Sequence, residues 1–143
     1  MKKLLTAVAL LTWASLAAAQ GSPVGLWKTI DDETKQEKSF VRIVEASGAL
    51  VGKIEKLLDP TKQDSVCDQC SDGRKGQKVL GMTIIEGVKK HADEAYWDSG
   101  TILDPNNGKT YRVRLTPKDG GKSLEVRGFI GPFFRNQTWL RVE

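Results

Sequence analysis

Short runs of alternating apolar and polar residues, each ended by a turn signal, follow one another from residue 24 to the C-terminus. In one run Tyr111, Val113 and Leu115 alternate with charged and hydroxyl side chains. A period of two places the apolar side chains on one face of a β-strand and the polar ones on the other. The pattern predicts strands at residues 24–30, 38–45, 49–58, 79–88, 95–103, 109–116, 123–130 and 136–142.

The connections carry the residues that tight turns between antiparallel strands require. Residues 104–108, Asp-Pro-Asn-Asn-Gly, combine a proline that fixes φ with an Asn-Gly pair suited to positive φ, and residues 119–121 read Asp-Gly-Gly. The 104–108 segment lacks the alternating acids and final glutamate of an EF-hand calcium loop. Consecutive hairpins favour a closed barrel over a two-sheet sandwich. The predicted fold is therefore all-β, an antiparallel, lipocalin-like up-and-down barrel of about eight strands.

The N-terminal residues 1–19 have the composition of a secretory signal peptide. Two lysines at positions 2 and 3 precede a mostly apolar run over residues 4–16, and three alanines follow at 17–19. The apolar run is shorter than the roughly 20 residues that a membrane-spanning helix needs. We therefore expect cleavage before Gln20 and one domain over residues 20–143 with no membrane span. The expected location is outside the cytoplasm, with the periplasm favoured over the extracellular space.

The charge balance argues against a nucleic-acid-binding surface. The whole chain has 22 Lys and Arg against 18 Asp and Glu, a formal net charge of +4. Removal of Lys2 and Lys3 with the signal peptide lowers the basic count from 22 to 20, and these residues are interspersed with the acids. No nucleic-acid partner is expected.

Both cysteines lie in one short motif, Cys67-Asp-Gln-Cys70, inside the longest segment without strand periodicity. A redox dithiol needs a lowered thiol pKa, which the negative charges of Asp64, Asp68 and Asp72 disfavour. Two thiolates are only half of a tetrahedral zinc site, and carboxylates would have to complete it. In an exported chain the favoured interpretation is a disulfide that stiffens this loop, with zinc binding and redox activity as alternatives.

No residue pattern indicates a catalytic site. His91, the only histidine, stands in a polar turn, and no motif places a serine or cysteine nucleophile with it. We therefore expect a protein that is not an enzyme and that has no cofactor and no metal site. Its partner is expected to be a small molecule or another protein.

Motifs at the two ends of the domain resemble those of lipocalins and the wider calycin group. Gly25-Leu-Trp27 opens the first predicted strand, and Arg141 lies near the end of the last one. The resemblance implies that the glycine allows close backbone approach, the tryptophan plugs one end, and the arginine lies across the indole. Gly25, Trp27 and Arg141 are therefore predicted to be structural, with Arg135 as second choice for the arginine.

A second resemblance covers nearly all of residues 20–143. Residues 22–30, 52–54, the Cys-x-x-Cys segment, 79–82, 100–111 and 128–135 resemble the bacterial family called domain of unknown function 2147. This resemblance implies a secreted, lipocalin-like barrel that holds a ligand or binds a partner. It implies no established reaction.

The aromatic residues are the candidates for a ligand site. An eight-stranded barrel is just wide enough either to be packed solid or to hold one small ligand, so aromatic side chains either line a cavity or fill it. The residues predicted to form an apolar wall or lid, with an arginine at the mouth for an anionic group, are Trp97, Tyr111, Phe129, Phe133, Phe134 and Arg135. Residues 131–134, Gly-Pro-Phe-Phe, are expected to be a connection whose phenylalanines plug the barrel or, less favoured, form an exposed patch.

The predicted function is binding of a small apolar or amphipathic molecule in the barrel or at its mouth. The alternative is an interaction module, a packed barrel without a cavity that acts through its acidic loop and the Phe-Phe turn. A continuous cavity of a few hundred Å³ distinguishes the two. Arg112, Arg114 and Arg127 alternate with apolar residues and are expected to face solvent, while a sharper hypothesis points one of them inward to a carboxylate ligand.

Overall fold

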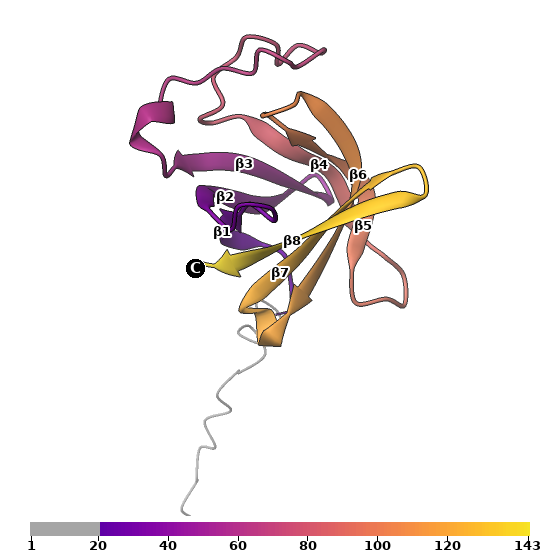
Figure 1. The fold of residues 1–143 in the computed structure, drawn as a ribbon. Coiled ribbons are helices and arrows are strands. Elements are labelled where there is room, and N and C mark those ends of the chain that lie inside the picture. The colour runs from indigo at the N-terminus through magenta and orange to yellow at the C-terminus, as the bar shows by residue number, and fades with distance from the viewer. Residues whose placement is uncertain (1–20) are drawn as a thin grey trace, which may run out of the picture.

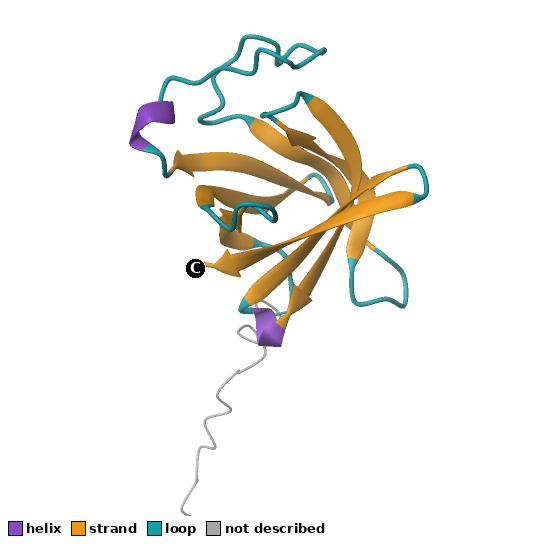
Figure 2. Cartoon of the chain, in the orientation of Figure 1, coloured by secondary structure: helices purple, strands orange, loops and turns teal. Residues whose placement is uncertain are grey.

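Strands make up nearly all of the regular structure in the computed structural model, which describes residues 21–143 (Figure 2). The predicted signal peptide at 1–19 and the predicted start at Gln20 lie outside the described residues. The elements are β1 Gly25–Ile30, β2 Glu37–Ala46, β3 Ala49–Leu57, η1 Pro60–Lys62, β4 Thr83–Lys90, β5 Trp97–Asp104, β6 Lys109–Lys118, η2 Asp119–Gly121, β7 Ser123–Ile130 and β8 Phe133–Arg141. Within this part of the chain no helix has the length and apolarity to cross a membrane.

Each strand pairs with the next in antiparallel orientation, and β8 returns to pair with β1. The closing contact matches Trp27 with Arg141 and Lys28 with Leu140. It continues beyond the strands, since the amide of Leu26 donates to the carbonyl oxygen of Glu143 at 2.9 Å. The barrel is therefore closed and leaves no free sheet edge. The prediction of an all-β, eight-stranded up-and-down barrel is confirmed.

The two ends of the barrel differ in their connections. Because consecutive strands are antiparallel, the segments 31–36, 58–82, 105–108 and 131–132 lie at one end, which we call the open end. The longest of them, 58–82, rises from the barrel at the top of Figure 1. The remaining connections lie at the opposite end, which we call the closed end, together with the start of β1 and the end of β8.

Alternate residues of each strand point into the barrel. On β6, Val113 and Leu115 are buried, whereas Arg112 and Arg114 face outward and lie over aromatic rings. Arg127 pairs with Arg114 across the strands and also faces outward, so the hypothesis of an inward arginine is wrong for all three positions. The buried core is Trp27, Val41, Ile43, Leu50, Ile54, Cys67, Cys70, Met82, Ile84, Ile85, Val88, Leu103, Val113, Leu115, Leu124, Val126 and Trp139.

Two strand boundaries differ from the prediction by more than two residues. β4 begins at Thr83 rather than at residue 79, because the preceding residues turn back against β3: the amide of Gly81 donates to the carbonyl oxygen of Ile54 at 2.7 Å. β8 begins at Phe133 rather than at residue 136, because Ile130 and Phe133 pair across a two-residue turn. The two phenylalanines after that turn therefore belong to a strand and not to a connection.

A tryptophan beneath an arginine seals the closed end. Trp27 is fully buried, and its Nε1 donates to the carbonyl oxygen of Pro23 at 2.7 Å. The guanidinium carbon of Arg141 lies 4.2 Å from the Trp27 ring centroid. Gly25 has a φ of 143°, and a Cβ at this position would lie 2.5 Å from Nη1 of Arg141. A larger residue at position 25 would therefore displace the arginine.

The long open-end loop is held by a disulfide between Cys67 and Cys70, so the favoured interpretation of the motif is confirmed. Both cysteines are buried. The β5–β6 turn approaches this loop so closely that a Cβ on Gly108 would overlap the carbonyl oxygen of Gln69. The disulfide therefore fixes a loop that packs onto the neighbouring turn at the open end.

Candidate functional site

The barrel is hollow at its open end. A cavity of about 680 Å³ extends from the open-end loops down between the strands. Its apolar lining includes residues of five strands and of the loop 58–82: Ile54, Leu57, Val79, Ile84, Ile102, Leu103, Val126 and Trp139. Trp27 is not among the lining residues, so the cavity stops above the plug of the closed end.

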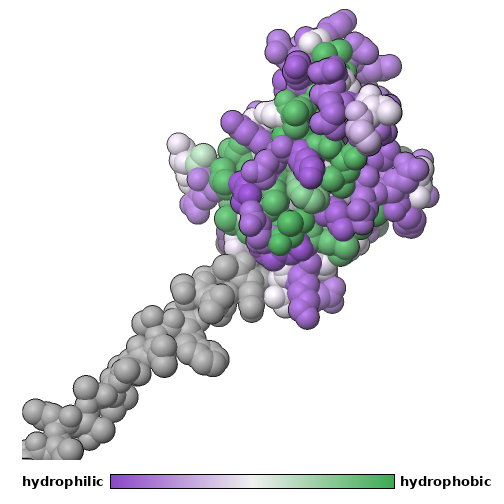
Figure 3. Space-filling model, turned by 90° about the vertical axis from the view of Figure 1, so that its left-hand side faces the viewer, coloured by the Kyte–Doolittle hydropathy of each residue, from purple (hydrophilic) through white to green (hydrophobic). Residues whose placement is uncertain are grey.

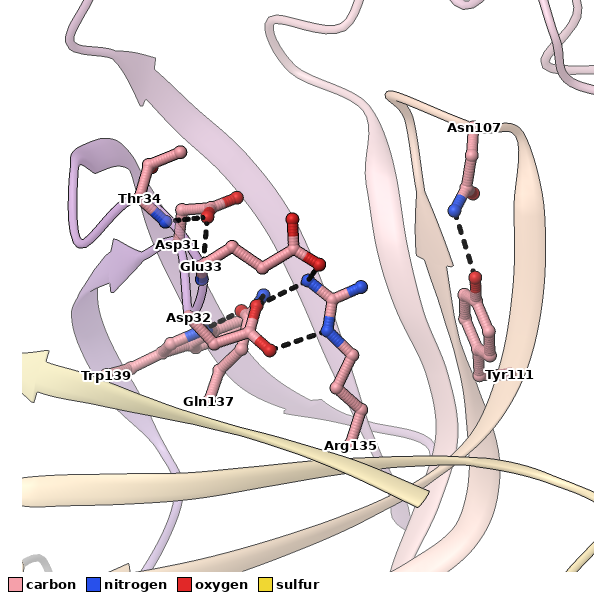
Figure 4. A network of polar contacts seen from close by, with 9 residues as sticks. All are labelled: Asp31, Asp32, Glu33, Thr34, Asn107, Tyr111, Arg135, Gln137 and Trp139. Atoms are coloured by element: carbon pink, nitrogen blue, oxygen red, sulfur yellow. Dashed lines mark hydrogen bonds and ion pairs between the residues drawn. The ribbon is translucent and has the colours of Figure 1, made fainter. Parts of the chain in front are cut away.

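Uncharged polar groups lie in the cavity wall beside the apolar ones. The hydroxyl groups of Thr29 and Ser39 are buried and lie 2.8 Å apart. Tyr111 faces inward from β6, and its hydroxyl oxygen accepts a hydrogen bond from Nδ2 of Asn107 at 2.9 Å (Figure 4). The cavity therefore offers a few neutral hydrogen-bonding groups next to an apolar surface.

A charged network crosses the rim between β8 and the loop 31–36 (Figure 4). Arg135 donates from Nε and Nη2 to the two carboxylate oxygens of Asp32, each at 2.5 Å. Gln137 donates to Asp32 at 3.3 Å and accepts from Nε1 of Trp139 at 3.0 Å. Arg135, Gln137 and Trp139 are alternate residues of β8, so their side chains share its inward face. Along this face Arg135 lies at the rim of the cavity, Gln137 in its wall and Trp139 at its floor.

The loop 31–36 has a fixed shape of its own. The Asp31 carboxylate accepts hydrogen bonds from the amides of Glu33 at 2.9 Å and Thr34 at 2.8 Å. The bond from Thr34 is the main reason that the pKa of Asp31 lies below its usual value. The Asp31 amide in turn donates to the carbonyl oxygen of Gln36 at 2.9 Å. The compact loop thereby places Asp32 against Arg135.

The contact between Arg135 and Asp32 makes stability depend on pH. Hydrogen bonds from Arg135 hold the pKa of Asp32 below its usual value of 3.8. The contact therefore stabilises the fold above that pH, and its contribution is lost as the pH falls through the lowered pKa. Because Arg135 is half exposed, we expect Asp32→Asn to lower the free energy of unfolding by only about 1 kcal/mol at neutral pH. The difference should shrink as the pH falls below 3.8 and through the lowered pKa of Asp32.

Urea unfolding of wild type and Asp32→Asn at neutral and acidic pH measures this difference. Asp68→Asn is a matched control, because Asp68 is an exposed acid of the same end with no ion pair among residues 21–143. A destabilisation by Asp32→Asn that stays the same at both pH values would contradict the role assigned to the carboxylate.

Four of the six candidate ligand residues line the cavity, namely Tyr111, Phe133, Phe134 and Arg135. Trp97 does not, because it begins β5 at the closed end and packs there against the core. Arg135 stands at the mouth as expected, but its guanidinium is already bound to Asp32.

Phe129 lies on the outer face of β7 instead of in the cavity. Leu124 and Val126 point inward from the same strand, so a residue three positions after Val126 must point outward. The Phe129 ring lies 6.2 Å from the ring of Phe134, and the Arg112 guanidinium lies 5.5 Å from its centroid. The alternation of apolar and polar residues that predicts β7 therefore also predicts that Phe129 points outward.

The phenylalanines of β8 do not plug the barrel, so the favoured expectation for them is wrong. Phe133 is 76% exposed and Phe134 is 56% exposed. A two-residue turn lets β7 and β8 run on to the rim, and it is too short to fold the rings back over the mouth. The rings therefore form an exposed edge of the cavity.

Several residues of the site were not predicted: Thr29, Asp32, Ser39 and Gln137. Gln137 is in phase with Trp139, so the alternation of β8 contained a signal for it. Asp32 lies in a turn, where side chains follow no periodic pattern, and its partner Arg135 is 103 residues away. Local sequence therefore offered no signal for that pair.

His91 lies in the β4–β5 turn at the closed end. Its Nδ1 lies 3.1 Å from Oδ2 of Asp98, and its ring lies 4.8 Å from the ring of Tyr96. In the described part of the chain no group of three His, Cys, Asp or Glu side chains is placed to hold a metal ion.

Comparison with protein families identifies the relatives of this barrel. The family model described as "Uncharacterized protein conserved in bacteria (DUF2147)" matches residues 25–141. The chain belongs to this family. The match spans all eight strands and both partners of the closed-end contact, Trp27 and Arg141.

A solved structure shares the architecture. It is described as "Protein HP1028 from the human pathogen Helicobacter pylori belongs to the lipocalin family", and it superposes with a TM-score of 0.72 at 19% sequence identity. The superposition covers 85% of this chain and 84% of that chain. No curated protein sequence matches the chain significantly. At this identity the similarity shows a lipocalin-like barrel fold and nothing about a shared ligand.

Proposed function

We propose that the protein is a binding protein and not an enzyme, and that it holds one small apolar or amphipathic molecule in the open-end cavity. The observation that carries this proposal is the cavity itself. Its volume of about 680 Å³ falls within the roughly 300–1,000 Å³ of small-molecule sites. An apolar floor with a few convergent polar groups is also the usual composition of such sites.

The polar end of the proposed ligand is neutral. The wall carries the hydroxyls of Thr29, Ser39 and Tyr111, each of which already has one hydrogen-bond partner and can make a further bond to an alcohol, ester or amide. Arg135 does not favour an anion, because a ligand carboxylate would have to replace Asp32. The cavity lining also carries the acids Asp31 and Asp59 together with the bases Lys38 and Lys62, so these four side chains add no net charge to it.

Binding in the barrel is favoured over the alternative of a packed interaction module. That alternative requires an interior filled by side chains, and the inward aromatic residues do not fill this one. Trp139 lies at the cavity floor, while Phe133 and Phe134 stay at the rim.

We further propose that the protein acts in the periplasm. The composition of residues 1–19 supports this location. The disulfide between Cys67 and Cys70 is compatible with it, because such bonds persist in oxidising compartments.

Titration with a neutral apolar fluorophore, N-phenyl-1-naphthylamine, tests the proposed function. We expect a saturable, blue-shifted signal with one site per chain, because the probe leaves water for the apolar floor. The anionic probe 8-anilinonaphthalene-1-sulfonate is the matched control and should bind more weakly, since Arg135 is occupied by Asp32. A signal that rises linearly with probe concentration, without saturation, would show that the cavity does not act as a site.

A further inference from the structure

Three apolar side chains are exposed together where the β7–β8 hairpin ends, and we call them the tip: Ile130, Phe133 and Phe134. Their exposed fractions are 55%, 76% and 56%. The hairpin projects from the side of the barrel at the right of Figure 1. On the side drawn in Figure 3, apolar residues also reach the surface among hydrophilic ones. The tip differs because its three exposed apolar side chains belong to one hairpin. An exposed cluster of this kind marks a contact surface.

Arginines stand directly behind the tip on the outer face of the barrel. The guanidinium of Arg127 lies 4.3 Å from the ring centroid of Phe134, and Nη2 of Arg112 donates to the carbonyl oxygen of Gly131 at 3.4 Å. Stacking and hydrogen bonding hold both cations in place, so little side-chain entropy remains to be lost when an anion binds.

The positive charge of this face is only partly compensated. Glu125 lies 3.5 Å from Arg127, and Asp32 neutralises Arg135 inside the rim. Arg112 and Arg114 have no carboxylate within 4.0 Å among residues 21–143. The face therefore presents apolar rings at its end and unpaired cations behind them.

The size of the tip argues for a lipid surface instead of a protein partner. A specific protein interface takes about 20–30 residues from each side, far more than one hairpin end offers. A bilayer interface needs only a few apolar side chains at its acyl boundary and cations at the depth of the phosphates. The hairpin has the same arrangement, with the apolar tip at its end and the arginines behind that end on the outer face of the barrel.

We propose that the tip inserts into the interface of a bilayer that contains anionic lipid, with Arg112 and Arg127 contacting the phosphates. The cavity mouth then faces the same surface, because Ile130 and Phe133 belong both to the tip and to the cavity lining. An amphipathic molecule could pass between bilayer and barrel without crossing bulk water. Docking itself goes beyond ligand binding and does not require an occupied cavity.

Flotation of the protein, purified from its own host, with lipid vesicles tests this docking. We expect the protein to float with vesicles of equal parts phosphatidylglycerol and phosphatidylcholine, and much less with phosphatidylcholine alone. Phe133→Ser should weaken binding about tenfold, since it removes a phenyl ring from the apolar boundary. Arg112→Gln should weaken it about fivefold at low salt, since it removes one cation near the anionic surface.

Two exposed positions away from the tip provide matched controls. Val44→Ser removes an exposed apolar side chain of β2, and Lys89→Gln removes an exposed cation of β4. Both variants should bind vesicles like wild type. The proposal is overturned if wild type does not float with the anionic vesicles, or if Phe133→Ser floats as well as wild type. It is also overturned if the tip joins two copies of the chain, seen as a dimer in sedimentation that Phe133→Ser dissociates.

The vesicle experiment is independent of the cavity. Flotation is measured without a probe, and the titration with N-phenyl-1-naphthylamine is measured without vesicles. A protein that binds the probe and does not float refutes the docking alone, whereas a protein that floats and binds no probe refutes the ligand site alone.

Discussion

Trp27→Ala is expected to lower the free energy of unfolding by about 3–5 kcal/mol, the largest loss for any single side chain considered. Trp27 has no exposed surface, and its ring fills the closed end between β1 and the return of β8. Truncation to alanine leaves a cavity there and also removes the hydrogen bond to the carbonyl oxygen of Pro23. Urea unfolding followed by circular dichroism measures the loss without depending on tryptophan fluorescence.

The arginine above the indole makes this loss larger than burial alone predicts. Arg141 donates to the carbonyl oxygens of Ser22 and Val24, each at 3.0 Å, and to that of Gly121 at 2.5 Å. Its guanidinium rests on the Trp27 ring, which sets its position. The ladder between β1 and β8 has two residue pairs, which backbone hydrogen bonds of Leu26 extend, so loss of this support weakens a short closure of the barrel.

Two variants separate the closed-end plug from tryptophan burial in general. Trp27→Phe keeps an aromatic ring under Arg141 but leaves the Pro23 carbonyl without its donor, so a smaller loss of about 1–3 kcal/mol is expected. Trp97→Ala removes a partly buried tryptophan that packs against the core from outside the plug. If Trp97→Ala destabilises as much as Trp27→Ala, the closed-end contact has no special role.

Gly128→Phe is expected to weaken binding of N-phenyl-1-naphthylamine about tenfold or more. Gly128 lies in the cavity wall on β7, and a Cβ there meets only Tyr111, at an ordinary contact distance of 3.5 Å. The phenyl ring would therefore extend into the cavity and occupy the volume that the probe requires. A strand position gains from an aromatic residue in place of glycine, so stability should change by less than about 1 kcal/mol.

A phenylalanine on the opposite face of the same sheet is the control for this variant. Thr138 on β8 is exposed and pairs with Glu125, whose side chain is on the outer face. Thr138→Phe adds comparable bulk outside the barrel and should leave probe affinity unchanged. Equal affinity of Gly128→Phe and wild type, with both folded by circular dichroism, would place the probe outside the cavity.

The strands were predictable because each one repeats a pattern that its own residues carry. β7 has the predicted bounds, and the inward positions of β6, Val113 and Leu115, follow directly from the alternation. Errors arose where a strand meets a turn. The sequence predicts that Phe133 and Phe134 belong to a connection, but pairing with β7 extends β8 to the rim.

The candidate site was predictable only in part, for a related reason. Tyr111 and Arg135 are in phase with inward residues of their strands, and both line the cavity. The aromatic chemistry of Phe129 predicts a ligand contact, but its position in the alternation of β7 points outward. Trp97 points toward the core, but it lies at the closed end, and depth along the barrel axis depends on how the strands are staggered.

The sequence by itself determined the family, the number of strands and which face of most strands is apolar. These features depend on residues that are neighbours in the chain, or on motifs that can be compared one by one. The tertiary structure alone decided that the interior is hollow, because cavity volume depends on how side chains from every strand meet. It alone paired Asp32 with Arg135 and left the tip exposed beside the mouth, since such contacts join segments that no local pattern relates.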